Sequence, residues 1–305
     1  MNDITGYCSD ISSQAQEPLA GTASQVHLWL LLEVNQPWGK KALFESSLPE
    51  PVKVRLMQWQ KLEGVTVLVI RQSSAHPLRK LRFFAALGEE QNPALYRYIL
   101  DAYEGLLGLD LPGEFESQTF SGEKMSEPLF LTCTNGKRDR CCARSGLPVY
   151  QALEGQVGEQ VWQSSHMGGH RFAPVVTVLP QGLVYGRLSL RDLPEFVRTV
   201  QQGGVDIEHL RGRACYPTAV QAAEIELHRK TGVLAENAYH LLEAINLEGS
   251  DDWQVRFQEH RTGWVYQLVV SPDPEEMHIL KSCADEEYET VRPLRLTSLE
   301  IQENR

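Results

Sequence analysis

Cysteines and histidines gather in one stretch of this 305-residue chain, between positions 133 and 170. Three of the six cysteines, Cys133, Cys141 and Cys142, lie within ten residues, and His166 and His170 follow at a metal-ligand spacing. Thiolates and imidazoles at short range are the ligands that soft metals and iron–sulfur clusters take from proteins. The stretch therefore predicts a metal centre, and the chain around it must fold so that these side chains meet.

Composition and charge narrow the classes of protein. The formal net charge is −11, so we do not expect a general nucleic-acid surface. The longest apolar run, residues 26–34, is too short to span a bilayer, and residues 1–14 lack the basic and apolar segments of a secretion signal. We expect a cytoplasmic protein that binds neither nucleic acid nor membranes. In that compartment clustered cysteines more often bind metals or do redox chemistry than form disulfides.

The hydrophobic pattern predicts a mixed α/β (α+β) fold in three parts: an N-terminal α/β domain over residues 1–125, a thioredoxin-like domain over 126–235, and a helix with a small antiparallel sheet over 236–305. In the first part we expect a polar arm (1–25), a strand (27–34), a helix (51–62), two strands (65–71, 81–87), a helix (93–107) and a linker (113–128).

The second part shows the order strand, helix, strand, hairpin, helix, which suits a thioredoxin-like layout. We expect a strand at 129–132, a loop at 134–142, a helix from 146, a strand at 161–165, a hairpin at 173–188 and a helix at 190–200. Both groups of candidate ligands would then lie in loops at one end of the sheet. After the helix at 190–200 we expect helices at 219–230 and 234–247, then strands from Trp253 onward.

The residues alone leave three kinds of chemistry open. Cys133, one of Cys141 and Cys142, His166 and His170 supply four ligands, which suit a tetrahedral zinc ion or a [2Fe–2S] cluster equally well. Thiol–disulfide chemistry is the third reading, because nearby arginines would lower the pKa of the adjacent cysteines, although no C-x-x-C motif is present. A basic loop is a poor place for cysteines that merely pack in a core. The remaining cysteines and histidines are dispersed in sequence, and we expect Cys8 to be an exposed thiol in the polar arm.

Two motifs resemble those of the sucrase/ferredoxin-like family, which comprises thioredoxin-like [2Fe–2S] ferredoxins. The first is CTNGKRDRCC at 133–142, a C-x8-C spacing with Arg138 and Asp139 inside it. The second is HMGGHRFA at 166–173, followed by a strand and by Tyr-Gly-Arg at 185–187. Weaker similarity extends over residues 7–235 and includes EPLAGTA at 17–23.

The resemblance implies a [2Fe–2S] cluster bound by Cys133 and Cys142 on one iron and by His166 and His170 on the other. Cys142 is favoured because AR-x-G follows it, as at the helix start of related ferredoxins, and Cys141 is the alternative. Around such a cluster we expect Gly168 and Gly169 to let backbone N–H groups approach the sulfurs and Asp139 to hold Arg138 or a histidine ring. Arg138 and Arg187 either tune the cluster or attract an acidic partner, or are solvated loop charges.

The implied function is electron transfer. Neutral imidazoles in place of two thiolates raise the reduction potential, as in Rieske centres, and can couple electron uptake to proton uptake. We see no general base, nucleophile or carboxylate pair suited to glycoside hydrolysis, so we expect an electron carrier and not a self-contained enzyme. The expected partner is a redox protein with an acidic docking face. The alternatives are a zinc-stabilised interaction module and a thiol–disulfide oxidoreductase.

A short internal similarity suggests a repeat. QSSAHPLRKLRFFA at 72–85 echoes QSSHMGGHRFAPV at 163–175, and the two halves share a rough order of elements. Our hypothesis is that residues 1–125 are a degenerate thioredoxin-like copy without ligands.

Overall fold

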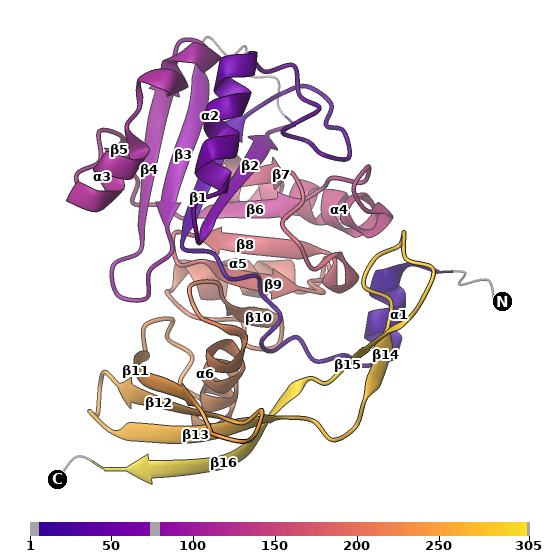
Figure 1. Ribbon diagram of the computed structural model, residues 1–305, viewed down its shortest axis with the longest axis vertical. Helices are drawn as coiled ribbons and strands as arrows, with labels where there is room; N and C mark the ends of the chain where they lie inside the picture. Colours follow the sequence, from indigo (N-terminus) through magenta and orange to yellow (C-terminus); the bar gives the residue numbers. More distant parts are fainter. Residues whose placement is uncertain (1–5, 74–79, 304–305) are drawn as a thin grey trace. The chain divides into compact units, whose positions relative to one another are not determined.

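The computed structural model describes residues 6–73 and 80–303, which divide into two compact units (Figure 1). The central unit comprises residues 26–167 and 176–182. The terminal unit comprises the described residues before 26, residues 168–175, and the chain from 183 onward. His76, one of the histidines that are dispersed in the sequence, lies outside the described residues. Within the described residues, no helix is long and apolar enough to cross a membrane.

The central unit is built on a mixed sheet whose strands within this unit follow the order β8-β6-β7-β2-β1-β3-β4-β5. The strands are β1 (Leu28–Glu33), β2 (Val65–Arg71), β3 (Leu81–Leu87), β4 (Ala94–Leu100), β5 (Glu123–Lys124), β6 (Leu129–Cys133), β7 (Val161–Ser164) and β8 (Val175–Leu179), which enters this unit at Val176. The helices are α2 (Glu50–Gln60), η1 (Tyr103–Gly108), α3 (Leu111–Ser117), α4 (Arg140–Val157) and η2 (Gly158–Gln160).

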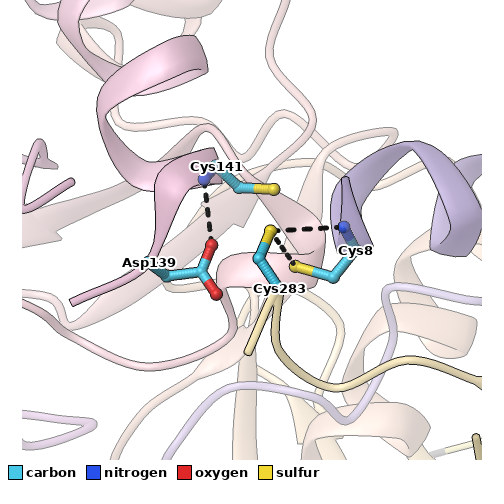
Figure 2. Close-up of side chains that lie close together, drawn as sticks. All are labelled: Cys8, Asp139, Cys141 and Cys283. Atoms are coloured by element: carbon cyan, nitrogen blue, oxygen red, sulfur yellow. Dashed lines mark hydrogen bonds between the residues drawn. The ribbon is translucent and has the colours of Figure 1, made fainter. Parts of the chain in front are cut away.

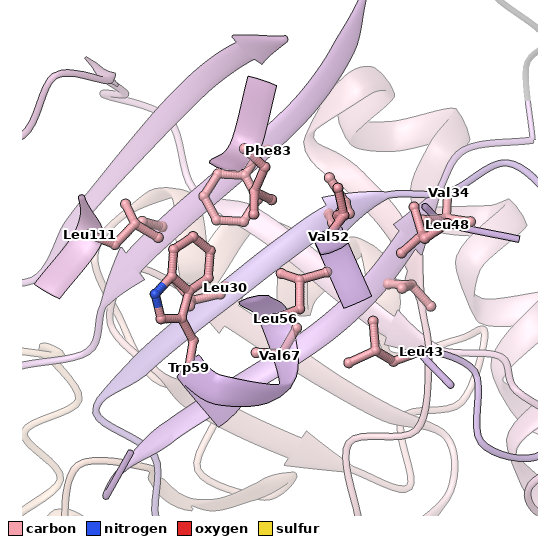
Figure 3. Packing of buried hydrophobic residues seen from close by; sticks show 14 of the residues in the cluster. Leu30, Val34, Leu43, Leu48, Val52, Leu56, Trp59, Val67, Phe83 and Leu111 are labelled. Carbon is pink, nitrogen blue, oxygen red and sulfur yellow. The ribbon is translucent and has the colours of Figure 1, made fainter. Parts of the chain in front are cut away.

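Helix α2 covers one end of this sheet through a stripe of apolar residues. Val52, Leu56 and Trp59 recur at helical spacing, are buried, and pack against Leu30 of β1 and Phe83 of β3 (Figure 3). All six residues of β1 are buried, as expected for a strand covered on both faces. This packing stabilises the half of the sheet formed by β1 to β4, which carries no predicted ligands.

Two segments of the central unit share one topology. In each, two parallel strands are joined by a helix, and a third strand pairs antiparallel with the outer side of the first: β1-α2-β2-β3 and β6-α4-β7-β8. The two segments meet where β2 and β7 pair antiparallel, with Ile70 opposite Ser164. The shared layout is consistent with the repeat hypothesis, which stays a prediction; part of the echo, residues 74–79, lies outside the described residues.

The terminal unit contains a second, antiparallel sheet, as the sequence predicts for the C-terminal part. Its order is β11-β12-β13-β16, and buried Val220, Ala223 and Leu227 of α6 belong to the same hydrophobic core as its inner face. The unit's elements are α1 (Cys8–Gln14), η3 (His170–Phe172), β9 (Leu183–Gly186), α5 (Leu193–Gln201), β10 (Leu210–Arg213), α6 (Thr218–Thr231), β11 (Tyr239–Asn246), β12 (Trp253–Glu259), β13 (Val265–Pro272), β14 (Met277–Ile279), β15 (Glu289–Val291) and β16 (Leu294–Gln302).

The mixed α/β class and the separate antiparallel sheet are confirmed, whereas the three-part domain division stays a prediction. Several predicted elements are wrong. Residues 93–107 form β4 and a 3₁₀ turn, and residues 234–247 contain β11, because pairing with β3 and β12 outweighs the local helical pattern. The expected linker at 113–128 contains most of α3 and all of β5. The expected arm at 1–25 contains α1, whose Cys8 is 0% exposed.

We predict that Leu56→Ala lowers the free energy of unfolding by about 2–5 kcal/mol, because Leu56 is fully buried in the α2 contact. Val54→Ala on the same helix is the matched control. Val54 is 44% exposed, so its truncation should change stability by no more than about 0.5 kcal/mol. Equilibrium denaturation in urea measures both, and equal losses in the two variants would contradict the packing described here.

Candidate metal centre

Three of the predicted ligands meet in the central unit. Cys133 ends β6, Cys142 lies in the first turn of α4, and His166 follows β7. The Nδ1 atom of His166 lies 3.9 Å from Cys133 Sγ and 3.7 Å from Cys142 Sγ, and all three ligand atoms lie within 4.8 Å of one another. Each cysteine is 1% exposed, and His166 is half-buried. These atoms form a group that could hold a metal.

Strand pairing explains why these residues meet. β6 and β7 are parallel, with Cys133 opposite Ser164, so both strands end at the same edge of the sheet. The helix that connects them must begin at that edge too, which brings Cys142 back beside Cys133. Ser165 then extends the pairing toward β2: its N–H donates to Val69 O at 2.9 Å, and its hydroxyl accepts from Val69 N at 3.2 Å. His166 therefore leaves the sheet from a fixed point.

The loop between Cys133 and α4 is held by its own polar residues. Thr134 donates its N–H to Ser164 O at 3.2 Å and its hydroxyl to Gln163 Oε1 at 3.1 Å. Buried Asn135 accepts the Arg138 N–H through its side chain at 3.3 Å and donates to Gly39 O at 3.2 Å. These bonds fix the path of the chain from the first cysteine to the helix.

Asp139 is the N-cap of α4. Its Oδ1 accepts the N–H of Cys141 at 2.9 Å, so the helix begins at Arg140, six residues before the predicted start. The expectation that residues 134–142 are all loop is therefore wrong for the last three. Successive helix residues point about 100° apart, so only one of the two adjacent cysteines can face Cys133. The sulfur that joins the group is that of Cys142, and the sulfur of Cys141 is not among these atoms.

The two buried thiols of the group influence each other's ionisation. A hydrogen bond from the Cys142 thiol holds the pKa of Cys133 well below 9.0, against the opposing effect of burial, and His166 lowers it further. The same hydrogen bond and burial raise the pKa of Cys142. The N-terminus of an 18-residue helix also favours negative charge at this point. Both effects favour negative charge on the sulfur of Cys133.

Gly146 sets the distance between α4 and β6. A Cβ at this position would lie 2.1 Å from the carbonyl oxygen of Cys133, so only glycine allows the helix to approach the strand this closely. This contact gives a physical reason for the AR-x-G sequence that follows Cys142.

His170 belongs to the terminal unit, where it is half-buried and begins η3. The chain reaches it through two glycines with positive φ, Gly168 at +88° and Gly169 at +69°. Backbone of this kind strongly favours glycine, which explains the Gly-Gly pair between the two histidines.

Arg211 is a residue that sequence reasoning missed. It is 2% exposed, and its guanidinium lies against Gly169, where a Cβ would come within 2.3 Å of Nη2. Its Nε donates to Thr22 Oγ1 at 3.0 Å. Burial and the neighbouring Arg171 lower the pKa of Arg211. The buried arginine supports the turn that leads to His170, and no local pattern in the sequence marks it.

Two further arginines support the same segment of the terminal unit. Arg171 forms an ion pair with buried Glu17, with Nε–O distances of 2.9 and 3.1 Å. Arg187 donates its backbone N–H to Phe172 O at 2.9 Å and its side chain to Glu17 O at 2.8 Å. Both guanidiniums, like that of Arg211, lie over the ring of Phe172. Arg187, predicted near the cluster, thus acts on the chain just after His170.

Two distant cysteines meet in the terminal unit. Cys8 Sγ and Cys283 Sγ lie 3.5 Å apart, and Cys283 Sγ accepts the N–H of Cys8 at 3.5 Å (Figure 2). The expectation of an exposed Cys8 is therefore wrong. A separation of 275 residues left no local signal for this pair.

Comparison with known proteins agrees with the motifs. The family model described as sucrase/ferredoxin-like matches residues 19–212, which is well over half of the chain. The chain belongs to the sucrase/ferredoxin-like family. Two solved structures are similar, both single cysteine-to-serine variants of the thioredoxin-like [2Fe–2S] ferredoxin from Aquifex aeolicus. Each has 21% identity, covers 28% of this chain and 97% of its own, and has a TM-score of 0.25. No curated protein matches.

Family membership and the cysteine–histidine group are compatible with an iron–sulfur redox role. Two of the residues expected around the site lie in the central unit. Arg138 is exposed on the loop before α4, and Asp139 is buried at the start of that helix. The other residues expected around the site, Gly168, Gly169 and Arg187, all lie in the terminal unit.

We predict that Gly146→Ala disturbs the site, because the new methyl group would displace α4 from Cys133 O. We expect a loss of about 1–3 kcal/mol in unfolding free energy and weaker metal retention. Gly155→Ala on the same helix is the control: nothing lies within 4 Å of the added Cβ, so stability should rise by up to about 1 kcal/mol. Urea denaturation and metal analysis measure both, and normal metal content in Gly146→Ala would contradict this reasoning.

We also predict that Gly169→Ala is more harmful than Gly203→Ala. Both glycines have a φ near +70°, so both variants carry a similar backbone strain of about 1–2 kcal/mol. Only at Gly169 would the new Cβ collide with Arg211, since Gly203 has open space around it. The difference between the two unfolding free energies isolates the arginine contact. Equal losses would show that Arg211 does not constrain the turn.

Proposed function

We propose that this protein is an iron–sulfur electron carrier that binds a [2Fe–2S] cluster through Cys133 and Cys142 on one iron and His166 and His170 on the other. The observation that carries the metal-binding part of the proposal is the convergence of two buried thiols and an imidazole nitrogen within 4.8 Å at one edge of the sheet. The cluster type and the fourth ligand come from the family resemblance and from the spacing of the histidines.

The donor set suits the group. Cys133 and Cys142 offer soft sulfur ligands, one of them with a lowered pKa, and His166 offers an imidazole nitrogen. A bound cluster would supply one-electron redox chemistry, at the raised potential that two imidazole ligands give. The residues of the chain keep water from the sulfurs, since each cysteine is 1% exposed.

His170 follows His166 by four residues in the chain. Four residues of extended chain span at most about 14 Å, and the two glycines between the histidines turn the backbone. An imidazole ligand keeps a second nitrogen that can take up a proton, so we propose that electron uptake is coupled to protonation of the histidine ligands. Half-buried His166 is the ligand from the central unit that reaches solvent.

A zinc site is the second candidate, and the distances between His166 Nδ1 and the two sulfurs favour it specifically. Zn–S and Zn–N bonds at a tetrahedral angle place sulfur and nitrogen about 3.6 Å apart. The separations of 3.7 and 3.9 Å between His166 Nδ1 and the two sulfurs are close to that value. Zinc would make this a structural module without redox chemistry.

The test is the visible absorption spectrum of anaerobically purified protein, with iron, sulfide and zinc assays on the same sample. We expect sulfur-to-iron absorption bands with about two irons and two sulfides per chain. Cys142→Ser should abolish the spectrum, because its sulfur belongs to the group of three. Cys141→Ser is the matched control and should retain the cluster, because the neighbouring sulfur is outside that group.

The contrary outcomes are distinct. A colourless protein with one tightly bound zinc would establish the structural module. Loss of the cluster in Cys141→Ser but not in Cys142→Ser would reverse the ligand assignment. A protein that takes up neither metal nor cluster after reconstitution would refute both candidates.

A further inference from the structure

A basic cleft lies directly beside His166 in the central unit. Its volume is about 310 Å³, and its lining includes Lys40, Lys41, Phe44, Asn135, Arg138 and His166. Among the described residues that line the cleft, none is acidic. The cleft therefore joins a candidate cluster ligand to a positively charged rim.

The positive charge at this place runs against the composition of the chain, whose net charge is −11. Lys40, Lys41 and Arg138 are all exposed. The loop before α4 and the first turns of that helix add three more exposed cations: Lys137, Arg140 and Arg144. Two carboxylates belong to the same loops: Glu45, which accepts the backbone N–H of Lys41 at 3.0 Å, and buried Asp139, which caps α4. The cations of these two loops and of the first turns of α4 thus outnumber the two carboxylates.

Hydrogen bonds and core packing fix the two loops that carry the cations of the rim. Asn135 of the ligand loop donates to Gly39 O of the lysine loop at 3.2 Å, which ties the two loops together. The Glu45 side chain lies against Gly39, where no Cβ would fit. Leu43 is 7% exposed and belongs to the hydrophobic core, whereas its neighbour Phe44 is 52% exposed at the cleft. An aromatic side chain among cations is a common composition for a protein contact.

We propose that this cleft is the docking surface for an acidic electron-transfer protein. Carboxylates of the partner meet Lys40, Lys41 and Arg138, Phe44 supplies the apolar contact, and the electron passes by way of His166. This inference rests on the proposed function. A protein fits better than a small anion, because the cations stand exposed on the rim and charge of this kind chiefly steers macromolecular encounters.

The experiment compares two double variants with the same change in net charge. Lys40→Glu/Lys41→Glu reverses the rim. Lys80→Glu/Lys124→Glu is the control, since these exposed lysines are at the start of β3 and on the edge strand β5, outside the cleft. Iron and sulfide are assayed in every sample, so that loss of the cluster is distinguished from loss of docking.

The probes are two redox proteins of opposite charge. Reduced flavodoxin, which is acidic, gives one electron to the oxidised cluster and becomes the semiquinone. Oxidised cytochrome c, which is basic, takes one electron from the reduced cluster. At low ionic strength we expect the rim variant to react with flavodoxin at least about tenfold more slowly than the wild type does. Its reaction with cytochrome c should be no slower than that of the wild type. The control variant should react with both proteins at rates near those of the wild type. The wild-type rate with flavodoxin should fall with added salt.

Binding gives a readout independent of electron transfer. Fluorescence anisotropy of labelled flavodoxin should show a dissociation constant at least about tenfold higher for the rim variant than for the control. Unchanged binding and rates in a rim variant that retains iron and sulfide would overturn the proposal. A second outcome would also overturn the proposal: millimolar inorganic phosphate at constant ionic strength weakens flavodoxin binding, while the rim variant binds flavodoxin and reacts with it as the wild type does. That result would assign the cleft to a small anion. Absence of a cluster in the wild type would instead refute the proposed function.

Discussion

The parallel pairing of β6 with β7 is the constraint on which the candidate site depends. It aligns Cys133 with Ser164, so the chain leaves both strands at the same edge. The connecting helix must then begin beside that edge, and its first turn supplies Cys142. A right-handed strand–helix–strand connection gathers polar chain ends there in many α/β proteins. Here the gathered groups are two thiols and an imidazole, which turns a general property of the fold into a candidate metal centre.

The half of the central unit without predicted ligands also contributes to the site. β2 pairs antiparallel with β7, and Val69 exchanges two hydrogen bonds with Ser165, one residue before His166. Arg71 of β2 donates to Gln163 of β7 at 3.3 Å. The lysine loop of the proposed docking surface comes from this half as well. If the halves arose by duplication, the first has kept a structural role at the site and supplied a charged surface to it.

Charge is arranged differently in the two units. In the central unit the cations near His166 are exposed, where they cost little and can attract a partner. In the terminal unit Arg211 is buried behind Gly169, and burying a charge is costly unless partners offset it. Thr22 accepts its hydrogen bonds, and Glu17, paired with Arg171, supplies negative charge nearby. Burying the Arg211 charge at this free-energy cost is consistent with a need to hold the turn before His170 in one conformation.

The sequence alone predicted the candidate donors and determined most strands and the family, because thiols, imidazoles and long apolar runs are local features. It also contained the signal for the start of α4, since Asp139 is a typical N-cap residue. Only the tertiary structure brought the sulfur of Cys142, and not that of Cys141, into the group with Cys133 and His166, because this depends on the phase of a helix against a strand. The contact of Arg211 with Gly169 and the position of Lys41 at the cleft beside His166 were equally invisible, because each joins residues far apart in the sequence. Residues 93–107 became β4 and a 3₁₀ turn for a related reason: pairing with β3 is a long-range interaction that local periodicity does not record.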